Sequence, residues 1–153
     1  MIELSFELGT EAETNSFGAR LATALRQGDV VCLEGPLGAG KSTLARGLIH
    51  ALSGANDIPS PTFTLVETYA VDGCELWHFD LYRLEKQSDV WELGFEDALD
   101  SGISLIEWPG KIDGILPTEA LRLSIDVQPD ARRRLRLIGP DRWMPALKRC
   151  GIA

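Results

Sequence analysis

Hydrophobic and polar residues repeat with two different periods in the first quarter of the chain. Residues Ile2 to Leu8 alternate between apolar and polar side chains, which predicts a half-buried strand. Thr10 then offers an N-cap with Glu13 as its capping-box partner. The apolar residues of 17–25 recur at helical spacing, and this pattern predicts a helix that ends near Gln27-Gly28.

A continuous apolar run follows at Val30 to Leu33 and predicts a buried parallel strand. After it comes a glycine-rich segment, and then a second helical pattern that continues to about Leu52. The sequence therefore predicts a strand, a glycine loop and a helix in direct succession.

The next segment changes from helical to strand-like patterning. Glycine, proline, asparagine and serine are concentrated at 54–61 and indicate a loop. Residues Thr62 to Val71 are rich in β-branched and aromatic side chains, and Glu75 to Tyr82 form a second apolar run. Asp72-Gly73 between them is a strong hairpin turn. We expect an antiparallel hairpin here, where a purely doubly wound fold would place a helix.

The remaining patterns complete the predicted fold. They indicate short helices within Ser88–Leu99, a buried strand at Ile103–Ile106, a C-terminal hairpin from Leu121–Val127 and Arg134–Ile138, and a last short helix within 141–150. No repeat or linker interrupts the chain. We expect one domain over residues 1–153, with a three-layer α/β fold, a mostly parallel sheet, the inserted antiparallel hairpin and the C-terminal hairpin.

Composition narrows the class of protein. The 153 residues are 44% hydrophobic and 25% charged, ordinary values for a globular protein. The net charge of −8 disfavours direct binding to nucleic acid by the surface as a whole. The three cysteines form no C-x-x-C pair, and the two histidines supply no recognisable zinc site. With no leader pattern and no apolar run of about 18 residues, we expect a cytoplasmic protein without a membrane segment.

The glycine loop fits the motif G-x-x-x-x-G-K-[ST] at every fixed position, and its strand and helix context makes the match credible. Glycines permit positive φ and a close approach to an oxyanion, while the following helix directs its positive end at a phosphate. A chance glycine turn followed by Lys-Ser is the alternative. We expect Lys41 to reach the β- and γ-phosphates and Ser42 to ligate Mg²⁺. The candidate nucleotide-binding residues of this segment are Gly35, Leu37, Gly38, Ala39, Gly40, Lys41, Ser42 and Thr43.

Two acids have the position that a phosphate loop requires. Asp80 and Glu107 each follow an apolar strand run, and ligands bind at the carboxyl ends of parallel strands. A carboxylate there holds Mg²⁺ directly or through water. Either acid alone is more often a solvated charge, but the motif in the same chain favours the functional interpretation. We therefore predict Lys41, Asp80 and Glu107 as catalytic residues, and Ser42, Asp80 and Glu107 as metal ligands.

Other candidates remain open between function and structure. Thr62 lies where nucleotide switches place a threonine that senses Mg²⁺ and the γ-phosphate, but a plain strand-start threonine is equally plausible. His78 shares a strand face with Asp80, and a structural histidine is favoured over a base. Trp108 is interpreted as a core residue before a nucleotide platform or a partner anchor.

The only basic cluster is Arg132 to Arg136, in which Arg132, Arg134 and Arg136 would share one face of a strand. A solvated edge strand is the common explanation, and a contact with triphosphate or RNA is the alternative. No Asn-Lys-x-Asp segment for guanine recognition is present. ATP is therefore the favoured nucleotide.

Five segments together resemble the TsaE family, the P-loop ATPases of bacterial tRNA threonylcarbamoyladenosine (t6A) biosynthesis. They are GPLGAGKSTL (35–44), SPTFTLVETY (60–69), HFDLYRL (78–84), ELGFED (92–97) and LIEWP (105–109), and the likeness extends from Glu11 to about Arg136.

The resemblance implies ATP and Mg²⁺ as cofactors, a switch role for Ser60 to Thr64, and nucleotide contacts from Glu11 and Arg132. We add Thr62 and Trp108 as candidate nucleotide-binding residues. The resemblance also implies that the chain works with a complex of TsaD and TsaB on adenosine 37 of tRNA, that tRNA is engaged indirectly, and that ATP hydrolysis is weak without the complex. Ser42 stands where many members have threonine, and either residue supplies the hydroxyl.

Two other functions compete with a partner-stimulated ATPase. A small P-loop kinase would transfer phosphate to a metabolite and would need an acceptor pocket and a mobile lid. A nucleotide-gated docking module would use hydrolysis only to reset its affinity for a partner. The fate of the phosphate separates the first from an ATPase, and single-round activity with ATP analogues supports the second.

Overall fold

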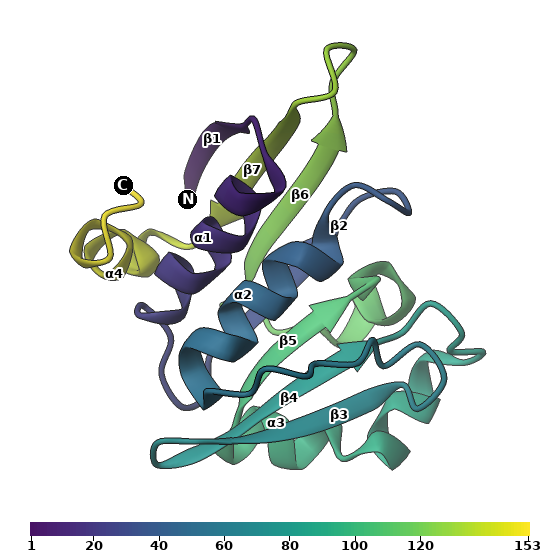
Figure 1. Cartoon of the computed structure of the whole chain (residues 1–153). Coiled ribbons are helices and arrows are strands. Elements are labelled where there is room, and N and C mark those ends of the chain that lie inside the picture. Colours follow the sequence, from purple (N-terminus) through teal and green to yellow (C-terminus); the bar gives the residue numbers. More distant parts are fainter.

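A seven-stranded mixed sheet forms the middle layer of the protein (Figure 1). The computed structural model describes residues 1–153. The strands lie in the order β1-β7-β6-β2-β5-β4-β3. Their bounds are β1 Ile2–Leu8, β2 Val30–Glu34, β3 Val66–Val71, β4 Cys74–Asp80, β5 Ile103–Glu107, β6 Leu121–Val127 and β7 Arg133–Gly139.

The centre of the sheet is parallel and both edges are antiparallel. Strand β2 pairs in parallel with β5 and β6, and β4 pairs in parallel with β5. The hairpin β3–β4 and the pairs β6–β7 and β1–β7 are antiparallel. The predicted α/β class, the inserted hairpin and the C-terminal hairpin are confirmed.

Helices cover both faces of the sheet, because alternate residues of the central strands point to opposite sides. Val31 and Leu33 of β2 belong to the larger core, which they share with the helices α1 (Glu11–Ala22) and α2 (Lys41–Ser53). Cys32 belongs to the smaller core on the other face, together with α3 (Phe95–Ser101).

Shorter helical segments complete the two outer layers. Two 3₁₀ segments contribute to the smaller core beside α3, and a third 3₁₀ segment leads into the last helix, whose Leu147 lies in the larger core. These segments are η1 Gln87–Leu93, η2 Pro109–Ile115, η3 Asp141–Trp143 and α4 Met144–Arg149. The chain has no helix with the length and apolar character needed to cross a bilayer.

Helices α1 and α2 pack closely because a glycine lies on each side of their contact. A Cβ atom on Gly18 would lie 2.2 Å from the carbonyl oxygen of Leu44, and one on Gly47 would lie 2.2 Å from that of Asn15. Neither backbone has room for a side chain at these positions. The contact fixes α2, and therefore the loop before it, against α1.

Two predicted boundaries were wrong. Helix α1 ends at Ala22 rather than near Gln27-Gly28, since the amides that follow bond three residues back in tight turns. Strand β3 begins at Val66 rather than Thr62, because Leu65 has a left-handed φ of 68° and its N–H donates to the carbonyl of Pro61. The segment η2 was predicted as loop.

Candidate nucleotide-binding site

The glycine loop joins the end of β2 to the start of α2, in the strand–loop–helix order that the sequence predicts. Gly35, Gly38 and Gly40 have φ values of 145°, 80° and 110°, a region that side chains with a Cβ rarely adopt. At Gly35 a Cβ would also lie 2.4 Å from the carbonyl oxygen of Ile125 on β6. The loop therefore requires glycine both for its conformation and for its packing on the neighbouring strand.

The N-terminus of α2 is left open to a ligand. Its N-cap is Gly40, which has no side chain to accept from the first amides, and no acidic residue occupies the first turn. The first N–H groups of a helix have no partner within the helix, and the helix dipole places positive charge there. An anion at this position would receive both hydrogen bonds and charge stabilisation.

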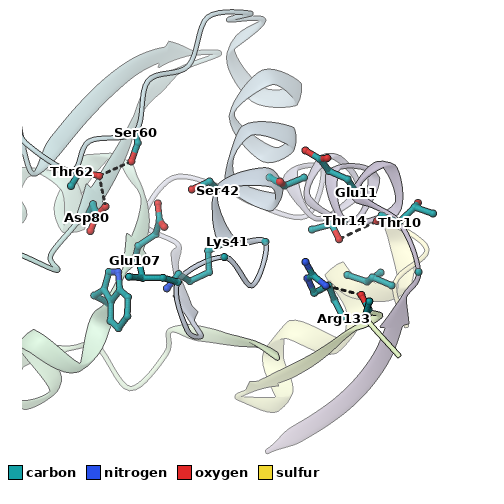
Figure 2. A pocket seen from close by; sticks show the side chains of 18 residues that line it. Thr10, Glu11, Thr14, Lys41, Ser42, Ser60, Thr62, Asp80, Glu107 and Arg133 are labelled. Carbon is teal, nitrogen blue, oxygen red and sulfur yellow. Dashed lines mark hydrogen bonds between the residues drawn. The ribbon is translucent and has the colours of Figure 1, made fainter. Parts of the chain in front are cut away.

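A cleft of about 460 Å³ opens in front of this helix end (Figure 2). Ser60, Thr62 and Asp80 approach it from one side, and Thr10, Glu11, Thr14 and Arg133 approach it from the other, with Lys41 and Ser42 between them. The structure brings together most of the predicted site residues. Those that line the cleft are Glu11, Leu37, Gly38, Gly40, Lys41, Ser42, Thr43, Thr62, Asp80, Glu107 and Trp108.

Lys41 lies at the bottom of the cleft with 5% of its surface exposed. Its ammonium donates to the carbonyl oxygen of Gly35 and lies 3.7 Å from the centre of the Trp108 ring, a cation–π contact. Burial lowers the pKa of Lys41, and the nearby carboxylates of Glu107 and Asp80 oppose that shift. No carboxylate lies within salt-bridge distance of the ammonium, which is available to an anionic ligand.

Asp80 and Glu107 are opposite one another where β4 and β5 run parallel. Asp80 accepts from the Thr62 hydroxyl at 3.3 Å and from the backbone N–H of Tyr82 at 3.1 Å. Burial raises the pKa of Asp80, as does the Glu107 charge, while the hydrogen bonds from Tyr82 and Thr62 lower it. The sheet thus places both acids at one edge of the cleft, as their strand-end positions predict.

Glu107 has a partner that spacing along the chain did not identify. Its Oε2 lies 2.7 Å from Nε2 of His78, and both side chains are about 95% buried, with 5% and 4% of their surfaces exposed. His78 is thus hydrogen-bonded, in agreement with the structural interpretation of this histidine. It does not itself line the cleft.

Trp108 is partly buried: it packs against the smaller core, as the core interpretation expects, and it also lines the cleft. Its backbone has a left-handed φ of 59°, an unusual conformation for a bulky residue. The Tyr82 ring packs against it with centroids 4.9 Å apart. Backbone strain of this kind is concentrated at functional sites.

Two arginines of the cluster form ion pairs on the sheet edge, and a third arginine lies at the cleft. Arg134 and Arg136 pair with Glu7 and Glu3 across the β1–β7 edge, as expected for a solvated strand. Arg132 precedes β7 and does not line the cleft, so it does not share a strand face with the other two.

The neighbouring arginine reaches the loop instead. Nε of Arg133 donates to the carbonyl oxygen of Ala39 at 3.0 Å, and its Nη1 donates to that of Ala131 at 2.7 Å. Two predicted residues of the loop, Gly35 and Ala39, do not line the cleft, and Ala39 is fully buried. Arg133 was not predicted as a cleft residue. The alternation of side chains along the strand does not show that the Arg133 side chain turns toward the loop.

The oxygen atoms at the cleft suit a hard cation. The chain has no group of three or more His, Cys, Asp or Glu side chains that would hold a metal ion by themselves. Mg²⁺ does not need such a group, since it is typically held by one or two carboxylates together with substrate phosphates and water. The Ser42 hydroxyl and the carboxylates of Asp80 and Glu107 therefore fit Mg²⁺ bound together with a phosphate.

The mixed sheet, the glycine loop and the open helix end define an α/β protein of the P-loop class. Comparison with known proteins gives a narrower assignment. The family model "Threonylcarbamoyl adenosine biosynthesis protein TsaE" matches residues 8–135, and the chain belongs to the TsaE family.

Individual relatives agree with the family match. The tRNA threonylcarbamoyladenosine biosynthesis protein TsaE of Rickettsia felis is 38% identical over 132 residues, which are 86% of this chain and 77% of the relative. The protein of the same name from Bacillus subtilis is 34% identical over 136 residues, 88% of this chain and 85% of the relative. The crystal structure of Bacillus subtilis YdiB has a TM-score of 0.76 and 28% identity, covering 97% of this chain and 94% of that one.

Proposed function

We propose that this chain is a Mg²⁺-dependent ATPase that supports threonylcarbamoyl transfer to adenosine 37 of tRNA together with TsaD and TsaB. Its membership of the TsaE family supports the pathway. One observation carries the ATPase proposal. Lys41, Ser42, Asp80 and Glu107 line a single cleft in front of an uncapped helix N-terminus.

The triphosphate would lie along the loop. Its oxygens would accept from the free amides at the start of α2 and from the Lys41 ammonium, which is buried and has no carboxylate within salt-bridge distance. The 460 Å³ cleft is within the range of small-molecule sites. Glu11, Thr62 and Trp108 line the same cleft and are candidates to contact the nucleotide.

The metal would be held by the Ser42 hydroxyl and, directly or through water, by Asp80 and Glu107. When bound, Mg²⁺ would supply positive charge to the β- and γ-phosphate oxygens. Thr62 donates to Asp80 and is in turn hydrogen-bonded to Ser60 at 2.8 Å. The 60–62 segment is therefore linked to a proposed metal ligand, which supports a switch role for it.

Hydrolysis would use Glu107 to orient the attacking water, since its carboxylate lies at the cleft opposite Asp80. No free arginine lines the cleft to stabilise the developing charge. The guanidinium of Arg133, the one arginine at the cleft, is engaged with two backbone carbonyls. In GTPases an arginine supplied by a partner accelerates hydrolysis by about 10³–10⁵. We therefore propose slow hydrolysis by the isolated chain and acceleration by TsaD–TsaB.

The surface argues for indirect engagement of tRNA. The net charge is −8, and two arginines of the only basic cluster are paired with glutamates. A polyanion would be repelled by such a surface as a whole. The protein complex would accordingly provide the contact with tRNA.

An ATPase assay with and without purified TsaD–TsaB and tRNA tests the proposal. We expect slow release of inorganic phosphate by the chain alone and at least a tenfold increase with the complex. Equal turnover in both conditions would contradict partner stimulation. Phosphate appearing on a metabolite instead of in solution would establish the kinase alternative, and one round of modification with a non-hydrolysable analogue would establish the docking module.

A further inference from the structure

The hydrogen bond between His78 and Glu107 crosses two central strands of the sheet. Strands β4 and β5 run parallel, with His78 opposite Leu105 and Asp80 opposite Glu107. The His78 ring lies behind the cleft and meets the Glu107 carboxylate from its buried side. His78 therefore contacts a cleft-lining acid without being accessible to a ligand.

With Glu107 ionised, the donor in this contact is Nε2 of His78. An ionised carboxylate accepts hydrogen bonds and cannot donate them, so Nε2 of His78 must carry the proton. Nδ1 is buried and has no partner within the chain. The geometry therefore places the donor of this hydrogen bond at Nε2 of His78.

The hydrogen bond restrains a flexible acid. A glutamate side chain has three rotatable bonds, and Glu107 is the last residue of β5, directly before Trp108 with its left-handed backbone. The bond from His78 engages Oε2 and leaves Oε1 for the cleft. The two acids repel each other across the strand pair, and the charge of Glu107 contributes to the raised pKa of Asp80. The hydrogen bond from His78 gives Glu107 a donor in this position.

We propose that His78 is a positioning residue that fixes the carboxylate of Glu107 through its Nε2–H, so that the second oxygen is held toward the reacting water or metal. The proposal rests on the ATPase function proposed above. Partners of this kind fix the orientation of ligating or catalytic groups, and their loss typically reduces affinity or activity by about 10–100-fold. A purely structural histidine would stabilise the fold without affecting turnover.

The first test is nitrogen-15 NMR of the wild-type protein without nucleotide or metal. The chain has only two histidines. The exposed His50 places its Nδ1 2.9 Å from the carbonyl oxygen of Ala55 and serves as the reference, with His50→Gln to assign the signals. We expect His78 to show the Nε2–H tautomer with a slowly exchanging proton. An Nδ1–H tautomer, or a ring proton that exchanges at the solvent rate, would overturn the proposal.

The second test compares two substitutions in the ATPase assay with TsaD–TsaB. His78→Leu fills the space without a donor, and we expect kcat to fall about 10–100-fold. His78→Gln places an amide donor near the position of Nε2, and we expect most of kcat to return. The Kd for ATP without Mg²⁺ should stay unchanged in both variants, because Lys41 and the loop are untouched. His50→Gln is the matched control and should behave as wild type.

Wild-type kcat in His78→Leu, or an equal loss in His78→Gln, would refute the positioning role. If His78→Leu does not fold, the NMR signal and the His78→Gln variant still decide. Failure of the wild-type protein to bind ATP would instead overturn the proposed function. The NMR experiment separates the two outcomes because it uses the protein without nucleotide.

Discussion

Asp80 and Glu107 are neighbours in register at the carboxyl ends of two parallel strands, although 27 positions separate them in the chain. The sheet brings their carboxylates to one edge of the cleft that also holds Lys41 and Ser42. Lys41 would contact the phosphates directly, whereas the two acids would act through Mg²⁺ and water. We therefore expect loss of Lys41 and loss of Glu107 to affect ATP binding and turnover differently.

Replacement of Lys41 by alanine should abolish ATP binding. The buried ammonium would contact the β- and γ-phosphates, and loss of one partner of a buried charged contact costs about 2–5 kcal/mol. We expect a Kd at least about 30-fold weaker by calorimetry. Lys148→Ala, at an exposed lysine of α4, is the control and should bind as wild type. Unchanged affinity in Lys41→Ala would remove the loop from the site.

Glu107→Ala should spare ATP binding and remove turnover. General acid–base groups contribute about 10²–10⁴-fold to rate, and we expect a loss in that range in the assay with TsaD–TsaB. Glu85→Ala, at an exposed glutamate, should leave the rate unchanged. If turnover persists in Glu107→Ala, the attacking water is oriented by another group.

Asp80→Asn should stabilise the nucleotide-free protein at neutral pH. Burial is the main cause that raises the pKa of Asp80 above its ordinary value of 3.8, with the Glu107 charge adding to it. The unfolded chain loses this proton first, so the free energy of unfolding falls as pH rises through the window between the unfolded and folded pKa values. The penalty is greatest where Asp80 is ionised in the folded protein as well.

We therefore expect a higher Tm than wild type at pH 7 and a smaller difference near pH 3.5. The same variant should lose the Mg²⁺-dependent part of ATP affinity. Asp72→Asn is the matched control, because Asn-Gly suits the exposed hairpin turn as well as Asp-Gly does. A Tm at pH 7 below that of wild type would contradict the predicted sign.

Gly47→Ala tests the close packing of α1 on α2. Helix propensity alone predicts stabilisation by about 1 kcal/mol. The added Cβ would lie 2.2 Å from the carbonyl oxygen of Asn15, however, and overpacking costs about 1–3 kcal/mol or more. We expect net destabilisation in urea unfolding. Ala51→Gly, at an exposed position of the same helix, measures propensity without the packing.

Local patterns predicted the elements well where one face of the chain is buried. The alternation at Ile2–Leu8 and the apolar run at Val30–Leu33 identified their strands, since burial selects those side chains. Strand β3 was predicted four residues too early because Thr62, Phe63 and Thr64 favour a strand by composition although the chain turns there. The left-handed φ of Leu65, which determines that turn, depends on tertiary contacts.

The site was predictable where residues are adjacent in the chain and less so elsewhere. The loop motif and the two strand-end acids follow from position along the sequence. The partnership of His78 with Glu107 and the reach of Arg133 to Ala39 join residues from different strands or loops. Sequence periodicity shows on which face of a strand or helix a side chain lies. It does not show which residue of another element that side chain contacts.

The position of β1 at the edge of the sheet also affects how the chain folds during synthesis. Its only neighbour in the sheet is β7, with Ile2 opposite Gly139 and Leu8 opposite Arg133. During synthesis the N-terminal strand emerges from the ribosome first, and it has no partner until nearly the whole chain has followed. The sheet closes last at the edge that was translated first, so a nascent chain stalled before residue 133 would expose an unpaired strand to chaperones or to other copies.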